Sequence, residues 1–225
     1  MTSVIMAAIG VAMLVVGALA LRLLPKVGAV AGLVAAICVG LAYDNIVVAI
    51  GRVVGYGDTL MAINMPRFWI HAVMTPLLII VAGNLVARLG VEQARTRNVV
   101  LGGWALVAML ILIGIVEDVV RLDLAPEDAG DALRYVNTGV EGAPIPAIIT
   151  VLALIVLGMV AWRYAGFPWL FVGALVMLIA APIGSSVLWV GNLGELVLMV
   201  SVLVTMAAVG GAKVPTTPSV TRPRP

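Results

Sequence analysis

Long runs of apolar residues, separated by short polar stretches, dominate the chain. Seven such runs lie at approximately residues 3–22, 28–50, 67–88, 98–118, 144–163, 167–189 and 191–212. About 20 apolar residues in a helix span the roughly 30 Å hydrocarbon layer of a bilayer. A helix also satisfies its own backbone polar groups there. The pattern predicts an all-α polytopic membrane protein with seven transmembrane helices in one domain, residues 1–212. Residues 213–225 are predicted to form a disordered tail, because they are rich in Pro and Thr.

Composition supports the same class. Of the 225 residues, 63% are hydrophobic and 11% are charged, whereas soluble domains average about 25% charged residues. The single cysteine, Cys38, excludes an intrachain disulfide and a cysteine metal motif. Nucleotide-binding glycine loops are missing as well. We therefore expect the lipid bilayer as the surrounding partner and no binding of nucleic acid.

The first apolar run could be mistaken for a signal peptide. It lacks a positively charged segment before it, and it is longer than the usual apolar core of about 7–15 residues. We therefore expect the first run to be retained as a membrane span.

Basic residues are unevenly divided between the two sets of alternating linkers. Linkers 1–2, 3–4 and 5–6, together with the tail, contain nine of the thirteen: Arg22, Lys26, Arg88, Arg95, Arg97, Arg163, Lys213, Arg222 and Arg224. The opposite side contains Arg52, Arg67, Arg121 and Arg134, together with ten of the eleven acidic residues. Because basic loops face the cytoplasm, the N-terminus is predicted outside and the C-terminus in the cytoplasm. A multi-pass protein of the plasma membrane is the expected localisation.

The longest connection, residues 119–143, lies on the predicted outer side. Within it, residues 126–136 are predicted to form a short helix on the membrane surface, because Ala132, Leu133 and Val136 can share one apolar face.

Polar residues from five predicted helices fall in one layer, about 5–10 Å below the outer surface by helical rise. The members are Asp44, Asn45, His71, Thr75, Glu117, Asp118, Ser185, Ser186, Asn192 and Glu195. An ionised group in mid-membrane costs on the order of 2.5–3.5 kcal/mol, so Asp44 and Glu195 should face the bundle interior or water. Pro76 and Pro182 lie close to this layer and loosen their helices. We expect an outward-open polar pocket between the second, third, sixth and seventh helices.

Three functions fit such a pocket. In the first, it binds or translocates a small polar or cationic ligand, or protons, with Asp44 as buried charge, His71 as titratable partner and Glu195 as second carboxylate. In the second, the same three residues hold a divalent metal in an intramembrane hydrolase or transferase acting on lipid. No paired-histidine metal motif accompanies them. In the third, the protein is a sensor or scaffold without turnover.

Each candidate also has a purely structural interpretation. Glu117 and Asp118 can be solvated at a helix end, and the serines and Asn192 can cap helices or bond neighbouring helices. His71 can bond to Asp44 or to a backbone carbonyl. No organic cofactor is predicted. Few polar residues continue toward the cytoplasm beyond Asn84, Ser201 and Thr205, which weakens translocation against enzyme or sensor roles.

Small residues recur every four positions at Gly28, Gly32, Ala36 and Gly40. Small residues on one face let helices approach closely. Packing within the chain is one interpretation of this stripe, and a homo-oligomer interface is the other.

Two features of the chain resemble known membrane-protein families. Val54-Gly55-Tyr56-Gly57-Asp58 resembles a potassium-channel selectivity filter, but Val53 replaces the expected threonine, Arg52 would repel cations, and no room remains for a pore helix. The predicted topology resembles that of rhodopsins. Those proteins hold retinal on a lysine in the middle of the seventh span, whereas the two lysines here, Lys26 and Lys213, lie at helix ends. Retinal is therefore not expected.

Overall fold

The computed structural model describes residues 1–211, so the predicted tail at 213–225 lies outside the described residues. Within them, six helices are long and apolar enough to cross a membrane. These are α1 (Thr2–Arg22), α3 (Ala29–Val54), α4 (Asp58–Arg88), α5 (Arg97–Ile115) with its π-helical extension η2 (Val116–Val120), α6 (Ile145–Ala165) and α8 (Leu188–Gly211). The chain is all-α in class, with the apolar helices of a multi-pass membrane protein.

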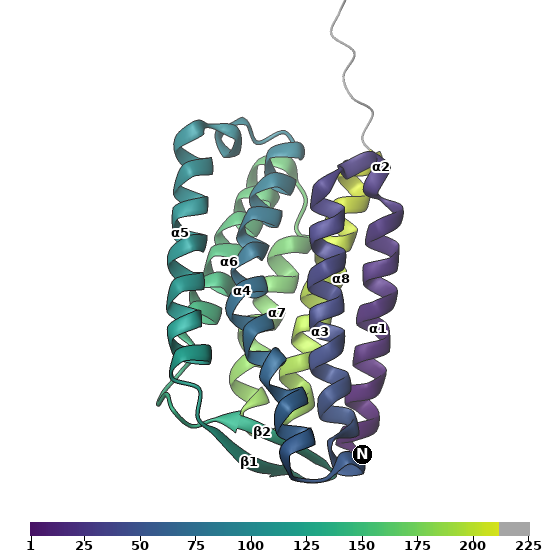
Figure 1. Cartoon of the computed structure of the whole chain (residues 1–225). Coiled ribbons are helices and arrows are strands. Elements are labelled where there is room, and N and C mark those ends of the chain that lie inside the picture. The colour runs from purple at the N-terminus through teal and green to yellow at the C-terminus, as the bar shows by residue number, and fades with distance from the viewer. Residues whose placement is uncertain (212–225) are drawn as a thin grey trace, which may run out of the picture.

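Shorter elements connect the long helices. They are α2 (Leu24–Val27), the 3-10 turn η1 (Glu92–Arg95), the apolar helix α7 (Trp169–Gly184), and strands β1 (Leu124–Ala129) and β2 (Ala132–Asn137). Figure 1 shows the helices side by side in a bundle. The strands and the N-terminus lie at one end, called here the hairpin end, and α2 lies at the other, the basic end.

Two helices have boundaries that differ from the predicted ones. The third helix begins at Asp58 rather than 67, because the short Gly55-Tyr56-Gly57 turn leads directly from α3 into α4 and α4 continues through Pro66. The helix expected at 167–189 is shorter, with 16 residues, because a turn at Ser185–Val187 interrupts it. By helical rise, its 16 residues cover about 24 Å, which is less than the roughly 30 Å hydrocarbon layer.

The predicted surface helix at residues 126–136 is wrong. This segment forms an antiparallel hairpin in which Leu124 pairs with Asn137 and Ala129 with Ala132. Gly130 has φ of +77° and starts a two-residue Gly-Asp turn, which favours a hairpin. Ala132, Leu133 and Tyr135 are buried against the helices. Tertiary contacts and turn chemistry therefore outweigh the helical spacing of the apolar residues.

Close helix contacts depend on small residues. A Cβ added at Gly10 or Gly17 of α1 would lie within about 3 Å of Ile46 or Cys38 of α3. Gly158 of α6 faces the backbone of α7 at Phe171, and Gly173 of α7 faces the side chain of Ser201 on α8. These contacts bring the helices into tight pairs, as expected when lipid-embedded helices associate by packing.

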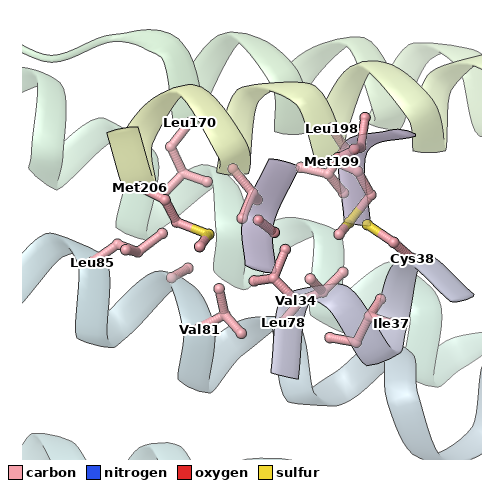
Figure 2. Close-up of a cluster of buried hydrophobic side chains, with 14 of the residues drawn as sticks. Val34, Ile37, Cys38, Leu78, Val81, Leu85, Leu170, Leu198, Met199 and Met206 are labelled. Carbon is pink, nitrogen blue, oxygen red and sulfur yellow. The ribbon is translucent and has the colours of Figure 1, made fainter. Parts of the chain in front are cut away.

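The main apolar core runs between α1, α3, α4, α7 and α8. Figure 2 shows part of it, with Val34, Leu78, Leu170, Met199 and Met206 converging between the helices. All five are at most 5% exposed. This core fills the middle and the basic end of the bundle, so polar side chains collect toward the hairpin end.

Candidate functional site

The most deeply buried acid, Asp44, forms an ion pair. Arg67 on α4 donates through Nε to Asp44 Oδ1 on α3 at 2.5 Å, and the two side chains are 10% and 3% exposed. A buried charge is tolerated when it is paired and hydrogen-bonded. Asp44 therefore faces the bundle interior, and its charge is balanced by a residue of the same chain.

Asn64 extends this pair to the hairpin. Its Oδ1 accepts from Arg67 at 2.6 Å and from the backbone N–H of Tyr135 at 3.2 Å, and its Nδ2 donates to Leu60 O at 2.7 Å. The carbonyl of Tyr135 lies 3.5 Å from the Arg67 guanidinium. Every polar atom of the Asn64 side chain is thus used, and β2 is fixed over the ion pair.

Two predicted site residues complete the surroundings of Asp44. Asn192 on α8 donates from Nδ2 to Asp44 Oδ2 at 3.3 Å. His71 on α4, one turn after Arg67, places Nε2 3.8 Å from Asp44 Oδ1, which is beyond hydrogen-bond distance. We call Asp44, Asn64, Arg67 and Asn192 the ion-pair cluster.

A cavity of about 60 Å³ lies beside the ion-pair cluster. Its lining comes from α3, α4, α6, α7 and α8. Four polar residues face it, namely His71, Thr75, Thr150 and Glu195, and the rest of the lining is apolar. A water molecule occupies about 30 Å³ in the liquid, so the cavity suits water molecules or a small ion rather than an organic molecule, whose pockets measure about 300–1,000 Å³.

Glu195 differs from Asp44 in its bonding. Its Oε2 is buried and has no hydrogen-bond partner among the described residues. Removing such an oxygen from water costs free energy unless another group satisfies it. Glu195 therefore presents an unsatisfied acceptor at the cavity.

Asn45 points elsewhere. It is fully buried, donates to Leu41 O at 2.8 Å, and packs where α3 meets Gly10 of α1. Its Oδ1 also has no partner among residues 1–211. It does not line the cavity.

The remaining predicted residues lie outside the cavity. Ser185 and Ser186 are exposed at the end of α7, and the Ser185 hydroxyl donates to Pro182 O at 2.7 Å. Glu117 and Asp118 are half-buried in η2, where the carbonyl of Glu117 accepts from Asn137. The structure thus brings His71, Thr75 and Glu195 together at one cavity, with α6 rather than the end of α7 as a wall.

The metal hypothesis gains no geometric support. Across residues 1–211, no three His, Cys, Asp or Glu side chains come together as a metal-binding group. Asp44 would otherwise be the strongest ligand of the predicted set, but it already forms an ion pair with Arg67.

The members of the small-residue stripe have different surroundings. Gly40 packs against Ile70 and Met74 of α4, whereas Ala36 is exposed. Gly28 is the turn residue before α3, with φ of +66°. Gly40 therefore packs within the chain. Ala36 is exposed, and the homo-oligomer interface stays a prediction.

Sequence reasoning missed Arg67, Asn64 and Thr150. Asn64, Arg67, His71 and Thr75 follow one another at spacings of three and four, so they share one helix face. That pattern places Arg67 on the same face as His71. Arg67 is, however, the first residue of the predicted span at 67–88, so by charge it counts among the basic residues of the outer side. No comparable signal marks Thr150, whose hydroxyl donates to Pro146 O of its own helix.

Comparison of the chain with protein-family models, with curated proteins and with solved structures finds no match.

Proposed function

We propose that the protein binds protons or a small cation in the membrane, at the cavity lined by Glu195 and His71. The observation that carries the proposal is the buried, unpartnered Oε2 of Glu195 beside a cavity of about 60 Å³. A cation or a proton would satisfy this oxygen. The size of the cavity limits the ligand to a few atoms.

The other polar groups have supporting roles. Asp44 is balanced by Arg67 and held by Asn192, so it contributes a fixed neutral pair rather than a second free carboxylate. His71 lies between this pair and Glu195, and histidine changes its charge near neutral pH. The hydroxyls of Thr75 and Thr150 are oxygen ligands of the kind that small hard cations prefer.

Binding is better supported than conduction. Toward the basic end the cavity adjoins the apolar core, and Ile37, Leu78, Leu198 and Met199 belong to both (Figure 2). Beyond them, Ser201 and Thr205 donate their hydroxyls to carbonyls of their own helix. A route through the bundle would require this core to open, so a sensor of protons or small cations fits better than a channel.

We further propose that α7 completes a seven-span topology, with the N-terminus outside. α6 and α8 both begin at the hairpin end (Figure 1), so α7 has to return across the bundle between them. α2 lies at the basic end (Figure 1), and with it the ends of α1, α4 and α6, the η1 turn and the start of α5. These segments carry Arg22, Lys26, Arg88, Arg95, Arg97 and Arg163, and among the described residues their one acid is Glu92. Basic loops favour the cytoplasmic side, and a plasma membrane with its outer face at the hairpin end agrees with this.

The test is thermal stability of the purified protein in sodium, potassium, ammonium or choline chloride at constant ionic strength. Wild type should be stabilised by at least one small cation, and choline, which is too large for the cavity, should have no effect. Glu195→Gln should abolish the effect. Glu117→Gln, which removes a half-buried carboxylate outside the cavity, should keep it.

A second measurement separates protons from metal or ammonium ions. If no salt acts, wild-type stability between about pH 5 and 8 should depend on pH in a way that Glu195→Gln removes. If Glu195→Gln matches wild type in both its salt and its pH responses, the proposal is wrong and the cavity is a packing defect.

A further inference from the structure

A separate cavity lies on the outside of the bundle, near the basic end. It is a groove of about 460 Å³ between α4, η1, α5 and α6. It shares no lining residue with the cavity at Glu195. Its size exceeds that of the first cavity severalfold and falls in the range of pockets that hold organic molecules.

Glycines open this groove. A Cβ added at Gly83 would meet nothing within 4 Å, and one at Gly103 would meet only Ile80, at 3.9 Å. The walls include Ile79, Val99, Trp104 and Leu157. Both α4 and α5 are long and apolar enough to cross a membrane. An apolar groove between them on the outside of the bundle would therefore face lipid chains.

One end of the groove is cationic. Arg95 lines it and uses Nε to donate to Ala87 O at 3.1 Å. Arg88 is nearby and donates from Nε to Asn84, another lining residue, at 2.7 Å. Among residues 1–211 neither arginine forms a salt bridge, and the acid Glu92 in η1 is exposed and likewise unpaired. Both guanidinium groups therefore keep terminal N–H donors for an anion.

We propose that the groove is a binding site for an anionic phospholipid of the leaflet at the basic end. An acyl chain would lie along Gly83 and Gly103, and the phosphate would accept hydrogen bonds from Arg95 and Arg88. Arginine forks match phosphate oxygens, and basic groups at the membrane surface attract anionic lipids. The apolar groove and the unpaired cationic end match the two parts of one lipid molecule.

The experiment measures lipid affinity by native mass spectrometry of the purified full chain, with phosphatidylglycerol and phosphatidylcholine of identical acyl chains. Wild type should prefer phosphatidylglycerol about fivefold per engaged arginine. Arg95→Gln should lower this preference about fivefold, leaving the contribution of Arg88, and should still bind both lipids. Arg22→Gln, which removes an exposed arginine of the same end on α1, should leave the preference unchanged.

Gly83→Leu tests the chain-binding part, because it fills open space while every charge remains. It should weaken both lipids, and its unfolding temperature should match or exceed that of wild type, since leucine favours a helix more than glycine. Equal preference in Arg95→Gln and wild type would overturn the proposal. So would full competition by glycerol phosphate, which would indicate a site for soluble anions, or a dimer that Gly83→Leu dissociates, which would indicate that a second copy covers the groove.

Discussion

Two inward-facing carboxylates, the buried Asp44 and the half-buried Glu195, face the same region of the bundle and are bonded very differently. Asp44 accepts from Arg67 and Asn192, whereas Glu195 keeps one buried oxygen without a partner. In the sequence both carboxylates belong to the same polar layer and are expected to face the interior. The difference shows that two inward-facing carboxylates of one region can differ in whether their hydrogen bonds are satisfied within the chain.

The largest expected effect comes from breaking the satisfied pair. Asp44→Asn leaves the Arg67 charge buried without its partner, which should cost about 3–5 kcal/mol in the free energy of unfolding. Glu195→Gln removes a charge that has no partner and should cost less than about 1 kcal/mol. Reversible unfolding of both variants in mixed micelles measures the difference. Equal losses would mean that Glu195 has a structural role like that of Asp44.

The same contrast recurs in two buried asparagines. Asn64 and Asn45 each donate Nδ2 to the carbonyl four residues earlier, but Oδ1 of Asn64 accepts two bonds and Oδ1 of Asn45 none. Asn64→Leu should therefore cost about 2–3 kcal/mol, because it leaves buried donors of Arg67 and Tyr135 unpaired. Asn45→Leu should cost less than about 1 kcal/mol. The free energies of unfolding of the two variants measure the difference. A larger loss in Asn45→Leu than in Asn64→Leu would contradict the prediction.

The hairpin that covers the ion-pair cluster can be displaced without touching a polar group. A Cβ at Gly51 would lie 1.8 Å from the carbonyl oxygen of Leu133, so Gly51→Ala should push β2 away from α3. We expect a loss of about 1–3 kcal/mol and faster hydrogen exchange of the Tyr135 amide. Gly102→Ala, where a Cβ meets nothing within 4 Å, should be neutral or stabilising. Unchanged exchange at Tyr135 in Gly51→Ala would contradict the close approach.

The smallest effect concerns a single hydroxyl of the cavity. Thr75→Val keeps the shape of the side chain and removes one oxygen that faces the cavity. If this hydroxyl bonds the ligand, affinity for the stabilising cation should fall by about two- to tenfold, with little change in stability without the cation. Salt titrations of the unfolding temperature measure it, and an unchanged affinity would remove Thr75 from the site.

Hydrophobic pattern and charge placement predicted much of the fold. Runs of apolar residues located α1, α3, α5, α6 and α8 within a few residues, because a helix in lipid needs a continuous apolar length. The start of α4 was missed because Pro66 and the charge of Arg67 resemble a helix boundary. The helix predicted at residues 126–136 rested on the helical spacing of apolar residues, whereas the Gly130-Asp131 pair, which the sequence also contains, favours the hairpin that the structure shows.

The sequence by itself determined that polar groups of several helices gather near one end of an apolar bundle, since ionisable residues are costly elsewhere in lipid. It placed His71, Thr75 and Glu195 in one layer and Asp44 facing inward; in the structure the first three residues line one cavity, and Asp44 is buried beside Arg67. Only the tertiary structure decided which carboxylate is neutralised. Pairing depends on the rotation of each helix about its axis and on angstrom-scale distances between α3, α4 and α8, which packing across the whole bundle sets and which no local pattern of residues encodes.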